Sequence, residues 1–188
     1  GNVFPPLFRD YLKRIESLNA LYQYNPDAGE IKRAIRNKGF PREKRTPLVK
    51  ELQKQYQSYP EKQAVSENIK SLSQENTYTI TTGHQCNIFG GPMYILFKLL
   101  SAIEYAHSLS QQYPEYNFVP LFWMATEDHD IEEINHFHLF GQTYQWQPEQ
   151  SGPVGRLHTQ GLEKILDQIN EKLTPFEEAY KNYNTLAD

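Results

Sequence analysis

Apolar residues recur at helical spacing through the first part of the chain, with lysine, glutamate and glutamine between them. A repeat of three or four residues predicts amphipathic helices. Pro5-Pro6 suits the start of the first helix, and Asp27 and Gly39 are the candidate cap and end of the second. The predicted helices cover residues 7–23, 27–39, 48–56 and 60–72. We therefore expect residues 1–75 to form an N-terminal helical segment.

The pattern changes at Thr77, where β-branched and aromatic residues predict a strand over 77–82. A glycine-rich loop follows, and then an apolar periodicity that predicts a helix over 93–112. The nearly continuous apolar run 118–125 is typical of a strand that is covered on both faces, so we expect its Phe122 and Trp123 to lie in the core. Strand, helix and strand make a βαβ unit with a parallel pair, which places residues 76–188 in an α/β domain.

The signal weakens after the second strand. We expect a short hairpin around Gly141-Gln142, because polar and apolar residues alternate on both sides of this turn signal. The remaining predicted elements are a strand over 154–157 and helices over 161–173 and 175–183.

Composition narrows the class of protein. Hydrophobic residues make up 38% of the 188 positions, so the core is thin, although 13 Tyr and 10 Phe add buried area. A formal net charge of −4 gives no basic face for a nucleic acid. No apolar run is long enough for a membrane span, and the N-terminus lacks the layout of a signal peptide. One cysteine excludes a disulfide framework, and a cytoplasmic location is expected.

The first candidate site is the loop that follows the first predicted strand. Gly83, His84 and Gln85 stand where ligands collect in open α/β sheets, before a helix whose N-terminus favours an anion. Glycines allow close backbone approach, and His84 and Gln85 offer donors to a phosphate or carboxylate, while Lys98 lies on the next helix. The alternative interpretation is an ordinary glycine-rich turn with a solvated histidine.

The second candidate site is the acidic run Glu127–Glu133, which directly follows the second strand. Five carboxylates and one histidine in seven residues repel one another unless a cation or a substrate ammonium neutralises them. Oxygen ligands suit Mg²⁺ and His129 suits a softer ion, so the identity of any metal stays open. The alternative is a solvated acidic loop that caps the next helix.

Other residues with chemical potential have simpler interpretations. Cys86 has no assignable activating partner and is expected to be packed rather than nucleophilic. His136 and His138 are expected on the polar face of a strand. Tyr94 either lines the pocket or packs on the sheet.

Two long motifs resemble a known family. The stretch TTGHQCNIFGGPMYILFK, followed by NFVPLFWMATEDHDIEEINHF, is similar to the bacillithiol biosynthesis cysteine-adding enzymes, also described as cysteine ligases. The positions that match the pattern of this family are Gly83, His84, Gln85, Phe89, Gly91, Pro92, Tyr94, Lys98, Val119, Pro120, Trp123, Ala125, Glu127, Asp128, His129 and Asp130.

The resemblance implies a Rossmann-like core akin to that of class I aminoacyl-tRNA synthetases, with the Gly83-His84 pair as the nucleotide signature. It implies the last step of bacillithiol biosynthesis, in which cysteine is joined to glucosaminyl-malate, with ATP as the expected cofactor. Family members are much longer and carry a C-terminal coiled coil that makes a homodimer. A chain of 188 residues is therefore expected to hold an N-terminal part and to be inactive by itself.

Nine residues of the two motifs have candidate roles. We expect His84, Asp128, His129 and Asp130 to be catalytic, and Gly83, Gln85, Gly91, Tyr94 and Glu127 to bind substrate or nucleotide. Because both motifs follow strands of one βαβ unit, they should meet at one edge of the sheet. The alternatives are a nucleotidyltransferase with the same core, or a helical interaction module without catalysis.

Overall fold

The computed structural model describes residues 4–25 and 27–174, so the helix predicted over 175–183 lies outside the described residues. The chain forms two compact units. Of the described residues, the first unit contains those up to residue 80 and residues 105–119, and the second contains residues 81–104 and 120–174. The division passes through two strands and one helix, and each unit is described by itself. The domain boundary predicted after residue 75 stays a prediction.

The first predicted helix is wrong in its length. Helix α1 (Pro6–Leu12) ends early, Arg14 takes a left-handed backbone conformation with φ of 56°, and the short 3₁₀ helix η1 (Glu16–Leu18) follows. The rings of Tyr11 and Tyr22 lie 5.0 Å apart. A continuous helix would separate these two residues by roughly 16 Å, because each residue rises 1.5 Å. The chain therefore has to turn between them.

The next three helices agree with the prediction apart from their starts. Helix α2 (Ala28–Asn37) begins with the Asp27 carboxylate accepting a hydrogen bond of 3.0 Å from the Glu30 N–H, which confirms the predicted cap. Helix α3 (Arg42–Tyr56) begins six residues before the predicted Leu48, and α4 (Gln63–Ser71) begins three residues after the predicted Pro60.

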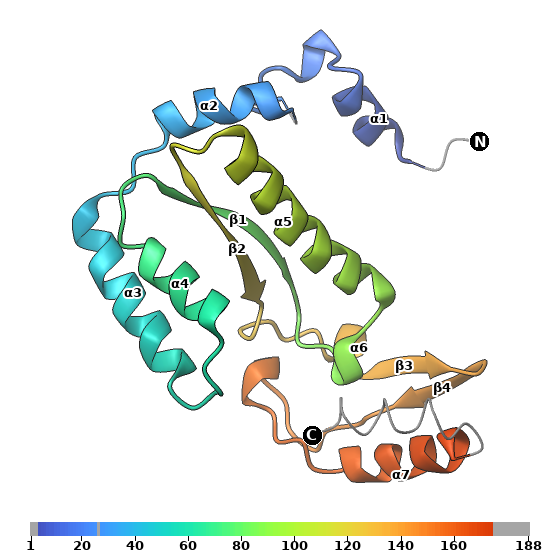
Figure 1. Ribbon diagram of the computed structural model, residues 1–188. Helices are drawn as coiled ribbons and strands as arrows, with labels where there is room; N and C mark the ends of the chain where they lie inside the picture. The colour runs from blue at the N-terminus through green and yellow to red at the C-terminus, as the bar shows by residue number, and fades with distance from the viewer. Residues whose placement is uncertain (1–3, 26, 175–188) are drawn as a thin grey trace. The chain divides into compact units, whose positions relative to one another are not determined.

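Two strands form the predicted parallel pair. Strands β1 (Thr77–His84) and β2 (Asn117–Met124) are neighbours in one sheet. The Asn117 N–H donates to the Asn76 carbonyl before the strands, and the Ala125 N–H donates to the His84 carbonyl at their ends. Helix α5 (Met93–Gln112) connects them over the residues that the pattern predicts. The chain thus contains a βαβ unit (Figure 1).

The core of the first unit lies where α2 and the end of α5 pack on the start of the sheet. Its buried residues come from α2, α5, the residue that follows α5, and β2, and they are Ile35, Ala106, Leu109, Tyr113 and Phe118. Arg45 is buried as well and donates to three backbone carbonyls, those of Leu72, Glu75 and Thr77, at 3.0–3.2 Å. This arginine ties α3 to the segment that leads from α4 into β1.

The end of β2 differs from the prediction of a strand covered on both faces. Trp123 is 60% exposed and Met124 is 51% exposed, and Phe122 is half-buried, so the predicted core position of Trp123 is wrong within the described part of the chain. The apolar run that predicts the strand carries no information about which end of it is covered. The first half of α5 also exposes apolar side chains, namely Met93, Leu96, Phe97, Leu100 and Ile103.

The core of the second unit lies between a hairpin and the last described helix. Strands β3 (His136–Leu139) and β4 (Gln142–Gln145) pair antiparallel, which confirms the predicted hairpin. Its turn is Phe140-Gly141, one residue earlier than expected, with φ of 48° and 76°. Two positive φ angles are typical of the type I′ turn that suits the twist of a hairpin. The cluster packed on α7 (Leu162–Leu173) consists of Ile88, Tyr144, Trp146, Ile165, Ile169 and Leu173.

The strand predicted over 154–157 is wrong. Val154–Arg156 form the 3₁₀ helix η3, because the Val154 and Gly155 N–H groups bond to the carbonyls of Asp128 and Thr126 and the chain then turns. The remaining elements are the 3₁₀ helix η2 (Ile88–Gly90) and the short helix α6 (Ile131–Ile134). Among the described residues, no helix is both long and apolar enough to cross a membrane.

Candidate functional site

The glycine turn at the end of β1 lies tightly against β2. A Cβ atom at Gly83 would stand 2.7 Å from the Trp123 carbonyl oxygen, so this close approach requires glycine. The Lys98 ammonium donates a hydrogen bond to the Gly83 carbonyl and lies 5.2 Å from the centre of the Tyr94 ring. Lys98 thus points back to the turn and joins it to α5.

The two motifs meet, as the sequence predicts. The side-chain amide of Gln85 donates a hydrogen bond of 3.0 Å to the Asp128 carboxylate. The same nitrogen donates to the carboxylate of Glu133. The loop after β1 and the acidic segment after β2 therefore lie together at the carboxyl edge of the parallel pair. The roles predicted for these residues stay predictions.

The acidic segment folds into a turn around its first aspartate. One carboxylate oxygen of Asp128 accepts from the N–H groups of His129 and Asp130, at 2.6 and 3.0 Å. These bonds, that of Asp130 foremost, hold the pKa of Asp128 below its usual value, and the Gln85 amide adds to the effect. Asp130 in turn caps α6 by accepting from the Glu133 N–H at 3.3 Å. The turn thus presents an ionised Asp128, as both the site and the solvated-loop interpretation require.

A hollow of about 530 Å³ lies beside the glycine loop and the hairpin. His84 lines this hollow, and the centre of its ring lies 5.3 Å from the centre of the Tyr94 ring. The hairpin contributes His136 and His138, whose ring centres are 5.6 Å apart. The residues that line the hollow are His84, Asn87, Phe89, Gly91, Pro92, Met93, Tyr94, Glu133, His136, Phe137 and His138. Of the nine residues with predicted roles, this lining contains His84, Gly91 and Tyr94.

The structure places the other predicted residues next to this hollow rather than in its wall. Asp128, His129 and Asp130 form the turn, and Gln85 and Glu133 connect that turn to the loop. Glu127 is exposed and its charge acts on Cys86. Within residues 4–25 and 27–174, no group of three His, Cys, Asp or Glu side chains is arranged to hold a metal ion.

Cys86 is unsuited to nucleophilic attack. Burial, and after it the negative charge of Glu127, raises the pKa of its thiol. A raised pKa leaves less of the reactive thiolate at neutral pH. This agrees with the interpretation of Cys86 as a packed residue.

The sequence did not predict roles for two residues of the site, Asn87 and Glu133. Asn87 donates a hydrogen bond of 2.9 Å to the Glu133 carbonyl, and its own side-chain oxygen is buried without a partner. Glu133 contributes both its carboxylate and its carbonyl to the contact with the loop. A signal existed for Asn87, because a polar side chain within a glycine loop is a candidate ligand. Nothing in the sequence separates Glu133 from the other carboxylates of the acidic run.

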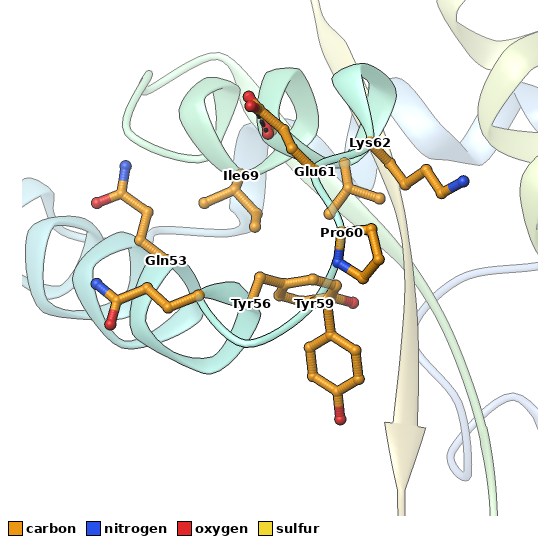
Figure 2. A pocket seen from close by; sticks show the side chains of 10 residues that line it. Gln53, Tyr56, Tyr59, Pro60, Glu61, Lys62 and Ile69 are labelled. Atoms are coloured by element: carbon orange, nitrogen blue, oxygen red, sulfur yellow. Dashed lines mark hydrogen bonds between the residues drawn. The ribbon is translucent and has the colours of Figure 1, made fainter. Parts of the chain in front are cut away.

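A second hollow, of about 570 Å³, lies in the first unit between α3 and α4. Figure 2 shows Tyr56 at the end of α3, the connection Tyr59–Lys62, and Ile69 on α4 around it. The rings of Tyr56 and Tyr59 are 5.9 Å apart. None of the nine residues with predicted roles lines this hollow, so the candidate site is the one at the sheet edge.

Comparisons with known proteins identify the family of the chain. Residues 2–188 match the family model described as bacillithiol biosynthesis BshC, N-terminal Rossmann-like domain. The chain is 43% identical over 197 residues to a Flavobacterium johnsoniae protein named "Putative cysteine ligase BshC", in an alignment that covers 98% of this chain and 37% of that protein. A Cytophaga hutchinsonii protein of the same name is 40% identical, with 98% of this chain and 35% of that protein covered. A Bacillus cytotoxicus relative, again of that name, is 34% identical over 68% of this chain and 23% of its own length.

The chain thus spans little more than a third of the length of the first two relatives. The match confirms the predicted fold class, an α/β Rossmann-like domain with a parallel pair of strands.

Proposed function

Because this chain belongs to the BshC family of bacillithiol biosynthesis, we propose that the whole protein is a ligase that joins cysteine to glucosaminyl-malate. The relatives carry the name of a cysteine ligase, and the chain covers their N-terminal Rossmann-like domain. The observation that carries the proposal for this chain is the hydrogen bond from Gln85 to Asp128, which brings the two family motifs to one edge of the sheet.

The proposed reaction forms an amide between the carboxyl group of cysteine and the amine of the sugar. A free carboxylate is a poor acyl donor, because an oxide ion is not a leaving group. ATP would supply the activation. Attack of the carboxylate on the α-phosphorus would release pyrophosphate and give an adenylate, whereas attack on the γ-phosphorus would release ADP and give an acyl phosphate. A Rossmann-like core suits the binding of ATP. The amine then attacks the activated carbonyl carbon, a proton leaves the nitrogen, and AMP or phosphate departs with the former carboxylate oxygen.

The residues divide between the two partners of this reaction. We propose that the backbone at Gly83 and the side chain of His84 contact the phosphates, beside the N-terminus of α5. Gly91 and Tyr94 line the same hollow. We propose that Asp128, His129 and Asp130 orient the amine or accept its proton, with Glu127 beside them. The ionised state of Asp128 supports the orienting role, because a carboxylate attracts an ammonium group.

The proposal extends to the setting of the protein. A single cysteine in this chain and a thiol substrate fit the reducing cytoplasm, which we propose as the location of the protein. We propose a homodimer for the whole protein, as the family resemblance implies. Light scattering of the purified protein after size-exclusion chromatography measures this directly.

A ligation assay tests the proposed function. The whole protein is incubated with cysteine, glucosaminyl-malate and ATP, and the products are identified by mass spectrometry. We expect a product with the mass of the two substrates minus one water, and its formation should require ATP. Release of AMP or of ADP then identifies the activated intermediate. Absence of the amide at every nucleotide concentration would refute the proposal.

A further inference from the structure

The amide group of Gln85 occupies a position between two carboxylates. Its nitrogen donates to Asp128 at 3.0 Å and also to Glu133. We propose that Gln85 is a positioning residue that holds the acidic turn in place, and not the phosphate contact that its place in the glycine loop indicates. The catalytic part of this inference rests on the proposed function. The contact of Gln85 with the two carboxylates rests on the hydrogen bonds alone.

The donor capacity of Gln85 decides between the two roles. A glutamine amide has two hydrogens, and both are directed at carboxylate oxygens. The opposite orientation of the amide would bring its own oxygen against two anions, which is repulsive. A phosphate needs donors, and Gln85 has none left for it. Its remaining polar atom is an oxygen, which repels a phosphate.

A neighbouring side chain strengthens the same connection. Asn87 donates a hydrogen bond of 2.9 Å to the Glu133 carbonyl. The side-chain amides of Gln85 and Asn87 therefore hold the side chain and the backbone of Glu133, respectively. The loop after β1 therefore holds the acidic segment Glu127–Glu133 at three points, through one hydrogen bond to Asp128 and two to Glu133. Hydrogen bonds to charged acceptors are the stronger kind, which favours a fixed geometry.

The choice of glutamine has a chemical consequence. A lysine or arginine in this place would hold the carboxylates equally well but would neutralise them. A neutral donor keeps Asp128 and Glu133 together and leaves their negative charge available. Gln85 thus acts on the substrate through the carboxylates.

Melting curves test the contact without any assay of activity. The variant Gln85→Glu places a third carboxylate between two others, which raises its pKa in the folded protein above the unfolded value of about 4.3. Below the unfolded pKa of about 4.3, the introduced carboxyl group is protonated in both states and the variant is tolerated. The destabilisation then grows as the pH rises through the raised pKa of the folded protein. We expect its Tm to fall below that of the wild type by about 4 °C at pH 7.5, and by less than about 2 °C at pH 4.5.

The chain offers a matched control. Gln63 donates a hydrogen bond of 2.8 Å to the Glu67 carboxylate on the exposed surface of α4. The variant Gln63→Glu makes the same chemical change away from the site, and an exposed pair of this kind contributes only about 0.2–0.5 kcal/mol. Equal melting of the Gln85→Glu and Gln63→Glu variants over the whole pH range would overturn the proposal.

Steady-state kinetics of the whole protein test the role. For Gln85→Met, which lacks the donors but keeps the length, we expect kcat to fall by about 10²-fold with the KM for ATP within about twofold of the wild type, because the misplaced turn affects the reacting groups. An increase in the KM for ATP at unchanged kcat would indicate that Gln85 contacts the phosphate, and would overturn the proposal. A wild-type protein that forms no amide refutes the proposed function instead, and the melting curves still decide whether Gln85 holds the turn.

Discussion

Gly83 lies so close to Trp123 that a Cβ atom at position 83 would stand 2.7 Å from the Trp123 carbonyl oxygen and 3.1 Å from its Cβ atom. The glycine of the predicted phosphate loop therefore has a structural role in the pairing of β1 with β2. This role is independent of any ligand.

We expect Gly83→Ala to destabilise the protein by about 1–3 kcal/mol, because the strands must separate to admit the methyl group. Gly39 is the matched control, since a Cβ atom there meets nothing within 4 Å and its φ is not positive. Gly39→Ala should leave the free energy of unfolding unchanged or raise it by about 0.4–1 kcal/mol. Urea unfolding of both variants measures the difference. Equal stability of the two would contradict the close approach.

Arg45 is 4% exposed and donates to the carbonyls of Leu72, Glu75 and Thr77. We expect Arg45→Ala to lower the free energy of unfolding by about 2–4 kcal/mol, because it leaves buried carbonyls without donors. Arg42→Ala, an exposed arginine on the same helix, should change it by less than about 0.5 kcal/mol. Chemical denaturation followed by circular dichroism checks both values, and a small effect of Arg45→Ala would show that α3 does not depend on this contact.

Cys86 is the one cysteine of the sequence, so thiol labelling reports on it alone. Burial and the charge of Glu127 raise the pKa of its thiol. We expect iodoacetamide to modify Cys86 more slowly than free cysteine at pH 7.5, with a rate that still increases at pH values where free cysteine has reached its plateau. The variant Glu127→Gln should increase the rate at pH 7.5 modestly, because the charge is the smaller of the two causes. If Cys86 were labelled faster than free cysteine, its thiol would be activated, which would contradict its interpretation as a packed residue.

Asp128 makes the stability of the protein depend on pH. The N–H groups of Asp130 and His129 lower the pKa of its carboxyl in the folded protein. A lowered pKa contributes stability above the unfolded value, near 3.8, and this contribution is lost as the pH falls through the folded value. The variant Asp128→Asn should therefore melt at a lower temperature than the wild type at pH 6, and the difference should shrink as the pH falls below 4. A difference that is constant from pH 3 to pH 6 would exclude this cause.

Local patterns sufficed for several elements of the fold. The bounds of α5 followed from its apolar repeat, which begins after Pro92 and stops before Pro114. The hairpin followed from alternation on both sides of Gly141. The break at Arg14 did not follow, because it accompanies side-chain contacts that span several helical turns, which a local repeat does not reveal. These are the ring contact of Tyr11 with Tyr22 and the ion pair of Arg14 with Asp27.

The candidate site was predictable in its location but not in its connections. Two loops that follow parallel strands must share an edge, so the meeting of the two motifs could be predicted from strand order alone. Which side chain joins them depends on the directions of individual hydrogen bonds. From the sequence, Gln85 is predicted to donate hydrogen bonds to a phosphate, whereas in the structure its amide donates to Asp128 and Glu133. The exposure of Trp123 was equally unpredictable, since an apolar run does not state what covers it.

The central claim is that both motifs act in one catalytic site. The turnover of two variants tests this claim most directly. In the whole protein, His84→Ala removes the side chain that we place on the phosphates, and Asp128→Asn removes the charge that we place on the amine. We expect kcat of amide formation to fall by about 10²–10³ in each variant, as for the loss of a preorganised polar group, while cooperative melting is retained. Turnover close to that of the wild type in both variants would contradict the account, because the two motifs would then be scaffold.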